Sequence, residues 1–110
     1  MGTEPRITLQ ALKVLTLLAD QPLEQHYGLA IATGTGLPTG TIYPILTRFE
    51  QAGWVTSDWE TIDPTMEGRP RRRFYRLTAL GEQKTRQALT EARKSLSVPW
   101  PPARPRQAPA

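Results

Sequence analysis

Residues 38–60, "PTGTIYPILTRFEQAGWVTSDWE", decide the fold because their pattern of apolar side chains changes partway along. Up to Gln51 the apolar residues are spaced i, i+3, i+4, i+7, which predicts a helix with one buried face. That face consists of Ile42, Ile45, Leu46 and Phe49. Gly53 suits the left-handed position that ends a helix. The residues after it are β-branched and aromatic, so we expect a strand to follow the helix directly.

A second strand pattern, "RRFYRLT", occupies residues 72–78. The intervening "DPTMEGRP" carries Pro64, Gly68 and Pro70, which predicts a hairpin loop rather than a further helix or strand. These segments together predict a two-stranded hairpin over about residues 54–77.

Two more helices are expected before this stretch. From Ile7 to Ala19 the apolar spacing is helical, with Thr8 or Thr3 as the cap at its start. This helix is apolar most of the way round, so we expect it to pack on two sides, one of them against another subunit. A short second helix is expected from Glu24 to Thr33, before the turn "TGTGLP".

After the hairpin, Thr78 is expected to cap a final helix from Ala79 to about Leu96. Residues 97–110, "SVPWPPARPRQAPA", are rich in proline and predict a disordered or polyproline-like tail. Two helices joined by a glycine-containing turn and followed by a hairpin, or wing, are typical of a winged helix-turn-helix. We therefore expect a mainly α fold of the α+β type, with this domain in residues 1–78 and a separate C-terminal helix in residues 79–96.

The composition favours a polyanionic partner and offers little for catalysis. The formal charge is +4, and five of the fourteen basic residues lie between Gly68 and Arg76 with no acid among them. There is no cysteine and only one histidine, His26, so we expect no metal site and no cofactor. Serines at positions 57, 95 and 97 have no base near them in sequence, and we expect no enzyme activity. With no signal core and no long apolar run, a cytoplasmic protein without a membrane partner is expected.

The helix of residues 39–51 has an outward face suited to a DNA major groove, which admits one helix. Thr39 or Thr41 is expected to cap it, with amides free to receive a phosphate, and Pro44 to lie in its first turn. The outward residues are Gly40, Tyr43, Pro44, Thr47 and Arg48. The alternative is that a Thr-Gly-Thr turn merely opens a helix and that an exposed tyrosine has no role.

The arginines of the wing are the second candidate DNA contact. Arg69 and Arg71 are the first choices, at a glycine-proline hairpin tip, followed by Arg72 and Arg73. Alternation along a strand sends Arg72 and Arg73 to opposite faces, so we do not expect both to contact one groove. The alternative is that the basic run is only a solvated face.

The chain closely resembles the PadR family of bacterial transcriptional regulators over about residues 12–89. The resemblance rests on "GTIYP" at residues 40–44, "FEQAG" at residues 49–53, "GRP" at residues 68–70 and "YRLTALG" at residues 75–81. It implies a homodimeric regulator that binds a near-palindromic operator in double-stranded DNA and usually represses. It also implies DNA contacts from Gly40, Thr41 and Tyr43, and from Arg69, Pro70 and Arg71 in the wing.

The resemblance further implies that the first and last helices form the dimer and that some members bind small aromatic effectors. The candidate dimer residues are Leu9, Leu12, Leu89, Ala92 and Leu96. Trp54 and Trp59 are candidate effector contacts, although packing on the inner face of the wing is the alternative for both. With one helix after the wing, the chain resembles the short members, and we expect a nucleoid-associated repressor. A protein-interaction module and an architectural, non-specific DNA binder are the competing interpretations.

Overall fold

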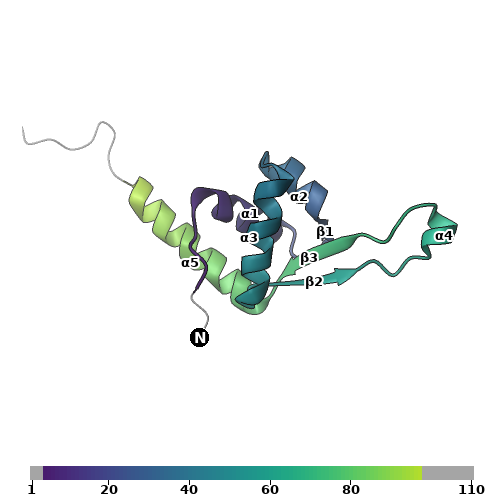
Figure 1. Ribbon diagram of the computed structural model, residues 1–110. Coiled ribbons are helices and arrows are strands. Elements are labelled where there is room, and N and C mark those ends of the chain that lie inside the picture. Colours follow the sequence, from purple (N-terminus) through teal and green to yellow (C-terminus); the bar gives the residue numbers. More distant parts are fainter. Residues whose placement is uncertain (1–3, 98–110) are drawn as a thin grey trace, which may run out of the picture.

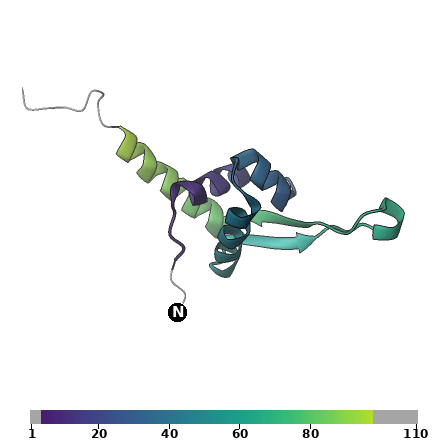
Figure 2. The same ribbon diagram turned by 45° about the horizontal axis from the view of Figure 1, so that its top comes forward.

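The computed structural model describes residues 4–97 (Figure 1). The elements are α1 (Leu9–Asp20), β1 (His26–Tyr27), α2 (Gly28–Thr35), α3 (Thr39–Gln51), β2 (Val55–Trp59), α4 (Pro64–Glu67), β3 (Arg73–Leu77) and α5 (Ala79–Leu96). Helices α1, α2 and α3 lie together beside a small sheet, while the wing and α5 extend from them in opposite directions (Figure 2). The expected winged helix-turn-helix is confirmed. From residue 98 onwards the predicted tail lies outside the described residues.

Helix α1 begins after Thr8, whose side-chain oxygen accepts a hydrogen bond from the Ala11 amide at 3.1 Å. Of the two candidate caps, Thr8 therefore fills the position. The helix buries Ala11 and Val14 on its inner face, as the apolar spacing predicts. Ile7 lies before the first turn and is partly buried against the core.

The prediction for the second helix was wrong at its start. His26 and Tyr27 form strand β1, which pairs antiparallel with Tyr75 and Phe74 of β3. Helix α2 therefore begins only at Gly28. Sequence spacing could not reveal this strand, because its two residues are too few to show a period and its partner lies far along the chain.

Helix α3 buries the predicted face, but its start differs from the prediction. Pro38 occupies the capping position, so neither Thr39 nor Thr41 caps the helix. Pro44 therefore lies in the second turn rather than the first, where it has no amide to donate to the Gly40 carbonyl. At the other end Gly53 adopts the expected left-handed conformation, with φ of 77°.

The sheet has three antiparallel strands in the order β1-β3-β2. In the wing, Val55 pairs with Leu77 and Trp59 with Arg73. The hairpin connection was predicted to be a loop, but it contains the one-turn helix α4 (Figure 2). The Asp63 side chain accepts a hydrogen bond from the Thr65 amide at 3.0 Å, and Pro64 supplies a helical first residue.

Helix α5 begins at Thr78, whose hydroxyl accepts a hydrogen bond from the Gly81 amide at 3.0 Å. At Gly81 the helix approaches the backbone before β2 so closely that a Cβ atom would lie 1.9 Å from the Trp54 carbonyl oxygen. Only glycine allows this contact without a shift. The far half of α5 extends beyond the other helices (Figure 1).

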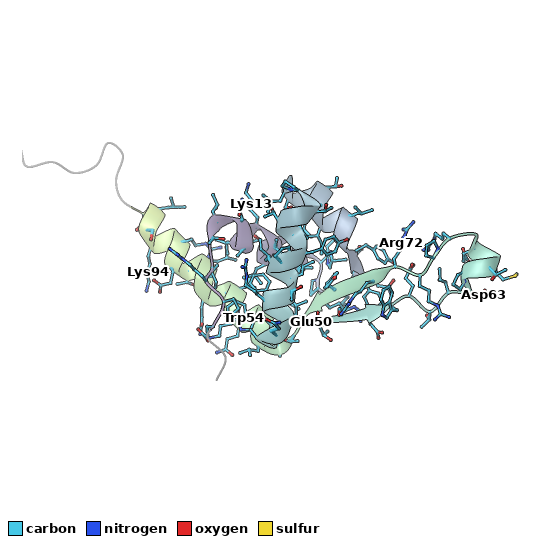
Figure 3. All side chains as sticks on the ribbon, in the orientation of Figure 1. Lys13, Glu50, Trp54, Asp63, Arg72 and Lys94 are labelled. Atoms are coloured by element: carbon cyan, nitrogen blue, oxygen red, sulfur yellow. The ribbon has the colours of Figure 1, made fainter. Side chains whose placement is uncertain are left out.

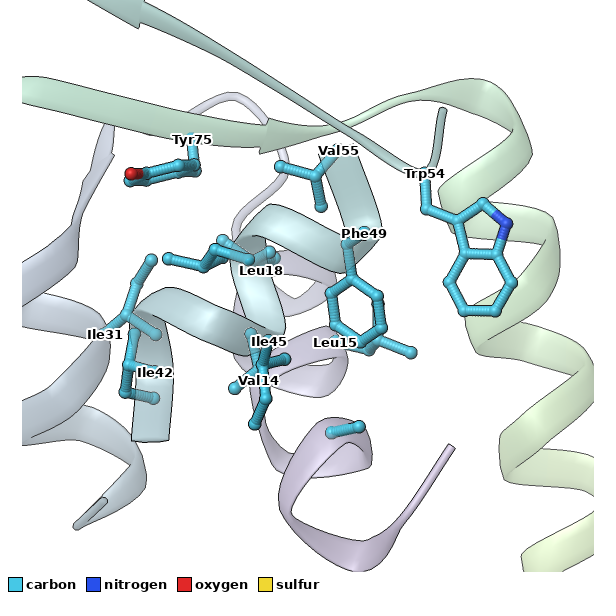
Figure 4. Packing of buried hydrophobic residues seen from close by; sticks show 12 residues of the cluster. Val14, Leu15, Leu18, Ile31, Ile42, Ile45, Phe49, Trp54, Val55 and Tyr75 are labelled. Carbon is cyan, nitrogen blue, oxygen red and sulfur yellow. The ribbon is translucent and has the colours of Figure 1, made fainter. Parts of the chain in front are cut away.

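The core lies between helices α1, α2, α3 and the sheet (Figure 4). Val14, Leu15, Leu18, Ile31 and Ile42 are fully buried in it. Towards α5, the rings of Phe49 and Trp54 stack at 5.4 Å between centroids. This packing fixes the buried face of α3, and therefore fixes which of its residues face outward.

Candidate nucleic-acid interface

The outward face of α3 is as the sequence predicts. Gly40, Tyr43, Pro44, Thr47 and Arg48 are all exposed, and so is Thr39, whereas Thr41 is half-buried. Tyr43 exposes 43% of its surface. The face carries a ring, hydroxyls and one cation without an acidic residue, which is chemistry that can meet both base edges and phosphates. Whether these residues contact DNA stays a prediction.

Tyr43 lies over the start of α2. A Cβ atom on Gly28 would lie 2.3 Å from the Tyr43 hydroxyl oxygen, so Gly28 is what allows the ring to lie there. Next to this contact is a hollow of about 380 Å³. It is lined by Tyr27, Gly28, Leu29, Ala30, Tyr43, Arg72 and Arg73. The hollow joins α2, the outward face of α3 and the base of the wing into one surface.

Arg72 and Arg73 point to opposite faces of the hairpin, as alternation predicts. The Arg72 guanidinium lies 5.7 Å from the centre of the Tyr27 ring, while that of Arg73 lies 5.8 Å from the Trp59 ring. Both side chains also line the hollow beside Tyr43. That they do not both contact one DNA groove stays a prediction. Arg72 directly precedes β3 on the returning arm of the wing (Figure 3).

Arg73 is held from α3 and β2. Its Nη2 donates to Ser57 Oγ at 2.7 Å and lies 3.3 Å from Glu50 Oε2, and Ser57 in turn donates to the same Glu50 oxygen at 2.6 Å. By contrast, Arg48, Arg71 and Arg72 form no ion pair within residues 4–97. Their charges are therefore available to an external anion.

Arg69 and Glu60 form the strongest polar cluster of the wing. Arg69 donates through Nη1 and Nη2 to the two Glu60 carboxylate oxygens, at 2.7 and 3.0 Å. Glu60 is 7% exposed, so its carboxylate is buried although it lies in the wing, directly after β2. The Arg69 hydrogen bonds, against the opposing effect of burial and with help from the Arg72 amide, lower the pKa of Glu60 to about 2.

Arg71 and Pro70 lie on the returning arm of the wing, and both are exposed. Arg71 Nε donates to the Ile62 carbonyl at 3.0 Å, which leaves the other guanidinium hydrogens free for a phosphate. Figure 3 shows Asp63 at the far end of the same hairpin. Arg71 is therefore a predicted contact with a partly free guanidinium on the outer part of the wing.

The two candidate effector residues differ in exposure. Trp54 is 2% exposed and belongs to the core, so its ring offers no face to a ligand in this protomer. Trp59 is 54% exposed, which contradicts the expectation that it packs on the inner face of the wing. Its ring meets Arg73 on one side instead.

The candidate dimer residues lie along α1 and α5, which pack against each other. Leu9 and Leu96 are 72% and 82% exposed, while Leu12, Leu89 and Ala92 are half-buried. An apolar row of this kind leaves surface uncovered in a single protomer.

Sequence reasoning missed three contributors to this surface: Tyr27, Leu29 and Glu60. Tyr27 was assigned to the interior of a helix, whereas it lies in β1 and packs edge to face against Phe74 at 6.4 Å. One available signal was that Glu60 lies on the first arm of the hairpin, opposite the run of arginines on the returning arm.

Among residues 4–97, no helix is both long and apolar enough to cross a membrane. Over the same residues, no three His, Cys, Asp or Glu side chains gather where they could hold a metal ion.

Residues 14–87 match the family model described as "Transcriptional regulator PadR-like family". No curated protein sequence matches the chain.

Among solved structures, the chain is similar to a PadR family transcription regulator from Clostridium difficile. The identity is 23%, the TM-score 0.68, and the match covers 81% of this chain and 92% of that one. A PadR family transcriptional regulator from Eggerthella lenta gives 24% identity, a TM-score of 0.62 and coverages of 80% and 79%. ZitR of Lactococcus lactis, in a mutant form, gives 18% identity and a TM-score of 0.64 over 88% of this chain, which spans only 60% of ZitR. At these identities the likeness shows a shared fold.

Proposed function

Because the chain belongs to the PadR-like family of transcriptional regulators, we propose that it binds a near-palindromic operator in double-stranded DNA as a homodimer and represses transcription. The observation that carries the proposal is the continuous surface formed by the outward face of α3, the hollow beside Tyr43 and the free arginines of the wing. Helix α3 enters the major groove, and the wing follows the adjoining backbone. The protein acts on chromosomal DNA in the cytoplasm.

Within this surface the residues have different roles. Tyr43, Thr47 and Gly40 face the bases, because they lie on the exposed side of α3. Arg48, Arg71 and Arg72 contact phosphates, because their charges form no ion pair within residues 4–97. Thr39, Thr41, Pro44, Arg69 and Arg73 complete the surface.

The test is selection of bound duplexes from a random pool, followed by fluorescence anisotropy on the selected sequence at two salt concentrations. We expect enrichment of one near-palindromic sequence and a binding constant that falls steeply as salt rises. Equal, salt-sensitive binding to selected and random duplexes would indicate an architectural binder instead. No binding to either would favour a protein-interaction module.

The dimer is proposed to form through α1 and α5. Leu9 and Leu96 are the exposed ends of the apolar row, and a second copy of the chain would cover them. Sedimentation equilibrium on Leu9→Glu tests this contact, with Leu23→Glu as a matched control. Leu23 is 90% exposed and lies outside α1 and α5. We expect the first variant to be monomeric and the second to behave as the wild type.

We further propose that a small aromatic effector releases the protein from DNA. Trp59 is the candidate side chain for contacting this effector. Its exposed ring and the neighbouring Arg73 would accept a planar anion. Titration of tryptophan fluorescence with a panel of aromatic carboxylates should give quenching that Trp59→Phe abolishes. Quenching that persists in that variant would exclude Trp59 as the contact.

A further inference from the structure

Glu60 is a buried carboxylate in an exposed arm of the wing. Its neighbours Trp59 and Thr61 are exposed, whereas Glu60 exposes only 7% of its surface. Oε1 accepts hydrogen bonds from Arg69 Nη1 at 2.7 Å and from the Arg72 amide at 2.8 Å. Oε2 accepts from Arg69 Nη2 at 3.0 Å. A buried carboxylate is tolerated only with such a set of donors.

The carboxylate also reaches strand β1. The Tyr27 hydroxyl lies 3.2 Å from Glu60 Oε2 and 2.9 Å from Oε1 of Gln25, so its single proton is shared between two acceptors. The Tyr27 ring in turn lies against the Arg72 guanidinium. Glu60 therefore connects the end of β2, the returning arm of the wing and β1 at one point.

Beyond this point the wing has little else to hold it. Helix α4 contains no buried residue, and its hydrogen bonds go only to residues at its own ends: the Asp63 cap before it and the amides of Gly68 and Arg69 after it. The Arg71 bond to the Ile62 carbonyl joins the two arms beside it. The backbone hydrogen bond from the Glu60 amide to the Arg72 carbonyl, at 2.9 Å, closes the hairpin at the same place. Losing the carboxylate would free the Arg72 amide and the Arg69 guanidinium together.

We propose that Glu60 is a positioning residue for DNA binding, whose negative charge raises affinity for DNA by fixing Arg72 beside Tyr43. The inference rests on the proposed DNA-binding function. Simple electrostatics predicts that removing an acid from a DNA-facing surface strengthens DNA binding. Positioning predicts that removing this particular acid weakens binding.

The decisive variant is Glu60→Gln, which keeps the shape of the side chain and removes its charge. Asp58→Asn is the matched control. Asp58 lies two residues before Glu60, is exposed, and accepts only from the amide of the next residue among the described bonds. By anisotropy on the selected operator, we expect Glu60→Gln to bind about tenfold more weakly. Asp58→Asn should bind equally or more tightly. Equal or tighter binding by a folded Glu60→Gln protein overturns the proposal.

A measurement on the free protein separates this inference from the proposed function. Hydrogen exchange followed by NMR should show the Arg72 amide exchanging at least about tenfold faster in Glu60→Gln, while amides in α1 stay unchanged. An unchanged Arg72 rate overturns the positioning role whether or not the protein binds DNA. Conversely, faster exchange in a protein that selects no DNA sequence contradicts only the DNA-binding function.

Two further variants keep the test decisive. If Glu60→Gln does not fold, Glu60→Asp keeps the charge but shortens the reach by one methylene. Positioning predicts weaker DNA binding for Glu60→Asp, whereas charge alone predicts no change. Combining Glu60→Gln with Arg69→Met should cost no more affinity than the larger single effect, because the two side chains act as one unit. Additive losses would show that they act separately.

Discussion

Helix α3 and the wing present one surface but are held in place by different forces. The four inward side chains of α3 are each 4% exposed or less, so the helix is fixed by apolar packing. In the wing, the ion pairs of Glu60 with Arg69 and of Glu50 with Arg73 add to the pairing of β2 with β3. Apolar packing is not screened by salt, whereas the half-exposed ion pair of Glu50 with Arg73 is. The part of the surface proposed to read bases is therefore the rigid one, and the part proposed to meet phosphates is adjustable.

The largest effect is expected from breaking the support of α3. Phe49→Ala removes a ring that is 1% exposed and stacked on Trp54, and should lower the free energy of unfolding by about 3–5 kcal/mol. Urea denaturation followed by circular dichroism measures this loss. Thr47→Ala, on the exposed side of the same helix, should change it by no more than about 0.5 kcal/mol. Similar losses for both would contradict the division of α3 into two faces.

The next largest effect is expected on the preference for one DNA sequence over another, rather than on the stability of the fold. Tyr43→Ala should reduce the preference for the selected operator over random DNA by about 1–3 kcal/mol, because the ring lies on the outward face of α3. Competition anisotropy gives this preference directly. Tyr43→Phe keeps the ring and isolates the hydroxyl. If Tyr43→Ala weakened binding to both duplexes equally, the residue would contact the backbone rather than bases.

A smaller and sequence-independent effect is expected in the wing. Arg72→Gln should weaken binding to operator and random DNA alike and lower the slope of log affinity against log salt by about 1. Arg86→Gln on the exposed side of α5 is the control and should leave the slope unchanged. A slope unaffected by Arg72→Gln would exclude a phosphate contact at this position.

The smallest effect is expected from pH, which changes the stability of the protein through Glu60 in the wing. Since the folded-state pKa of Glu60 is lowered from 4.5 to about 2, the group stabilises the protein fully above pH 4.5. That contribution is lost as pH falls from 4.5 towards 2. Unfolding measured between pH 2 and pH 8 should show a shallower acid slope in Glu60→Gln than in the wild type. Equal slopes would show that Glu60 is not held as an ion in the folded protein.

The sequence predicted the part of the molecule that depends on local periodicity. The apolar spacing of α3 and the change of pattern at Gly53 identified helix and wing, and the resemblance to the PadR family is confirmed by the match over residues 14–87. Strand β1 could not be predicted, because two residues show no period and their partners Phe74 and Tyr75 lie in a distant segment.

Only part of the candidate site could be predicted from the sequence. The exposure of Tyr43 followed from the helix, but the burial of Glu60 depends on Arg69 reaching across the hairpin, which no local pattern records. Helix α4 was missed although Asp63, Pro64 and Gly68 are its start and stop residues, because proline and glycine were assigned only to a turn. The roles of these residues in binding DNA stay predictions.

The contact between Gly81 and the Trp54 carbonyl has a consequence for operator geometry. It sets the angle at which α5 leaves the DNA-binding domain, and α5 has 18 residues, or a length of about 27 Å. In the proposed dimer, a small change in the tilt of α5 at Gly81 would displace the far end of this long helix by a much larger distance than the end near Gly81. Two recognition helices must be about 34 Å apart to read half-sites on one side of the double helix. Gly81, a buried residue inside the protomer, would then determine which spacing of half-sites the protein accepts.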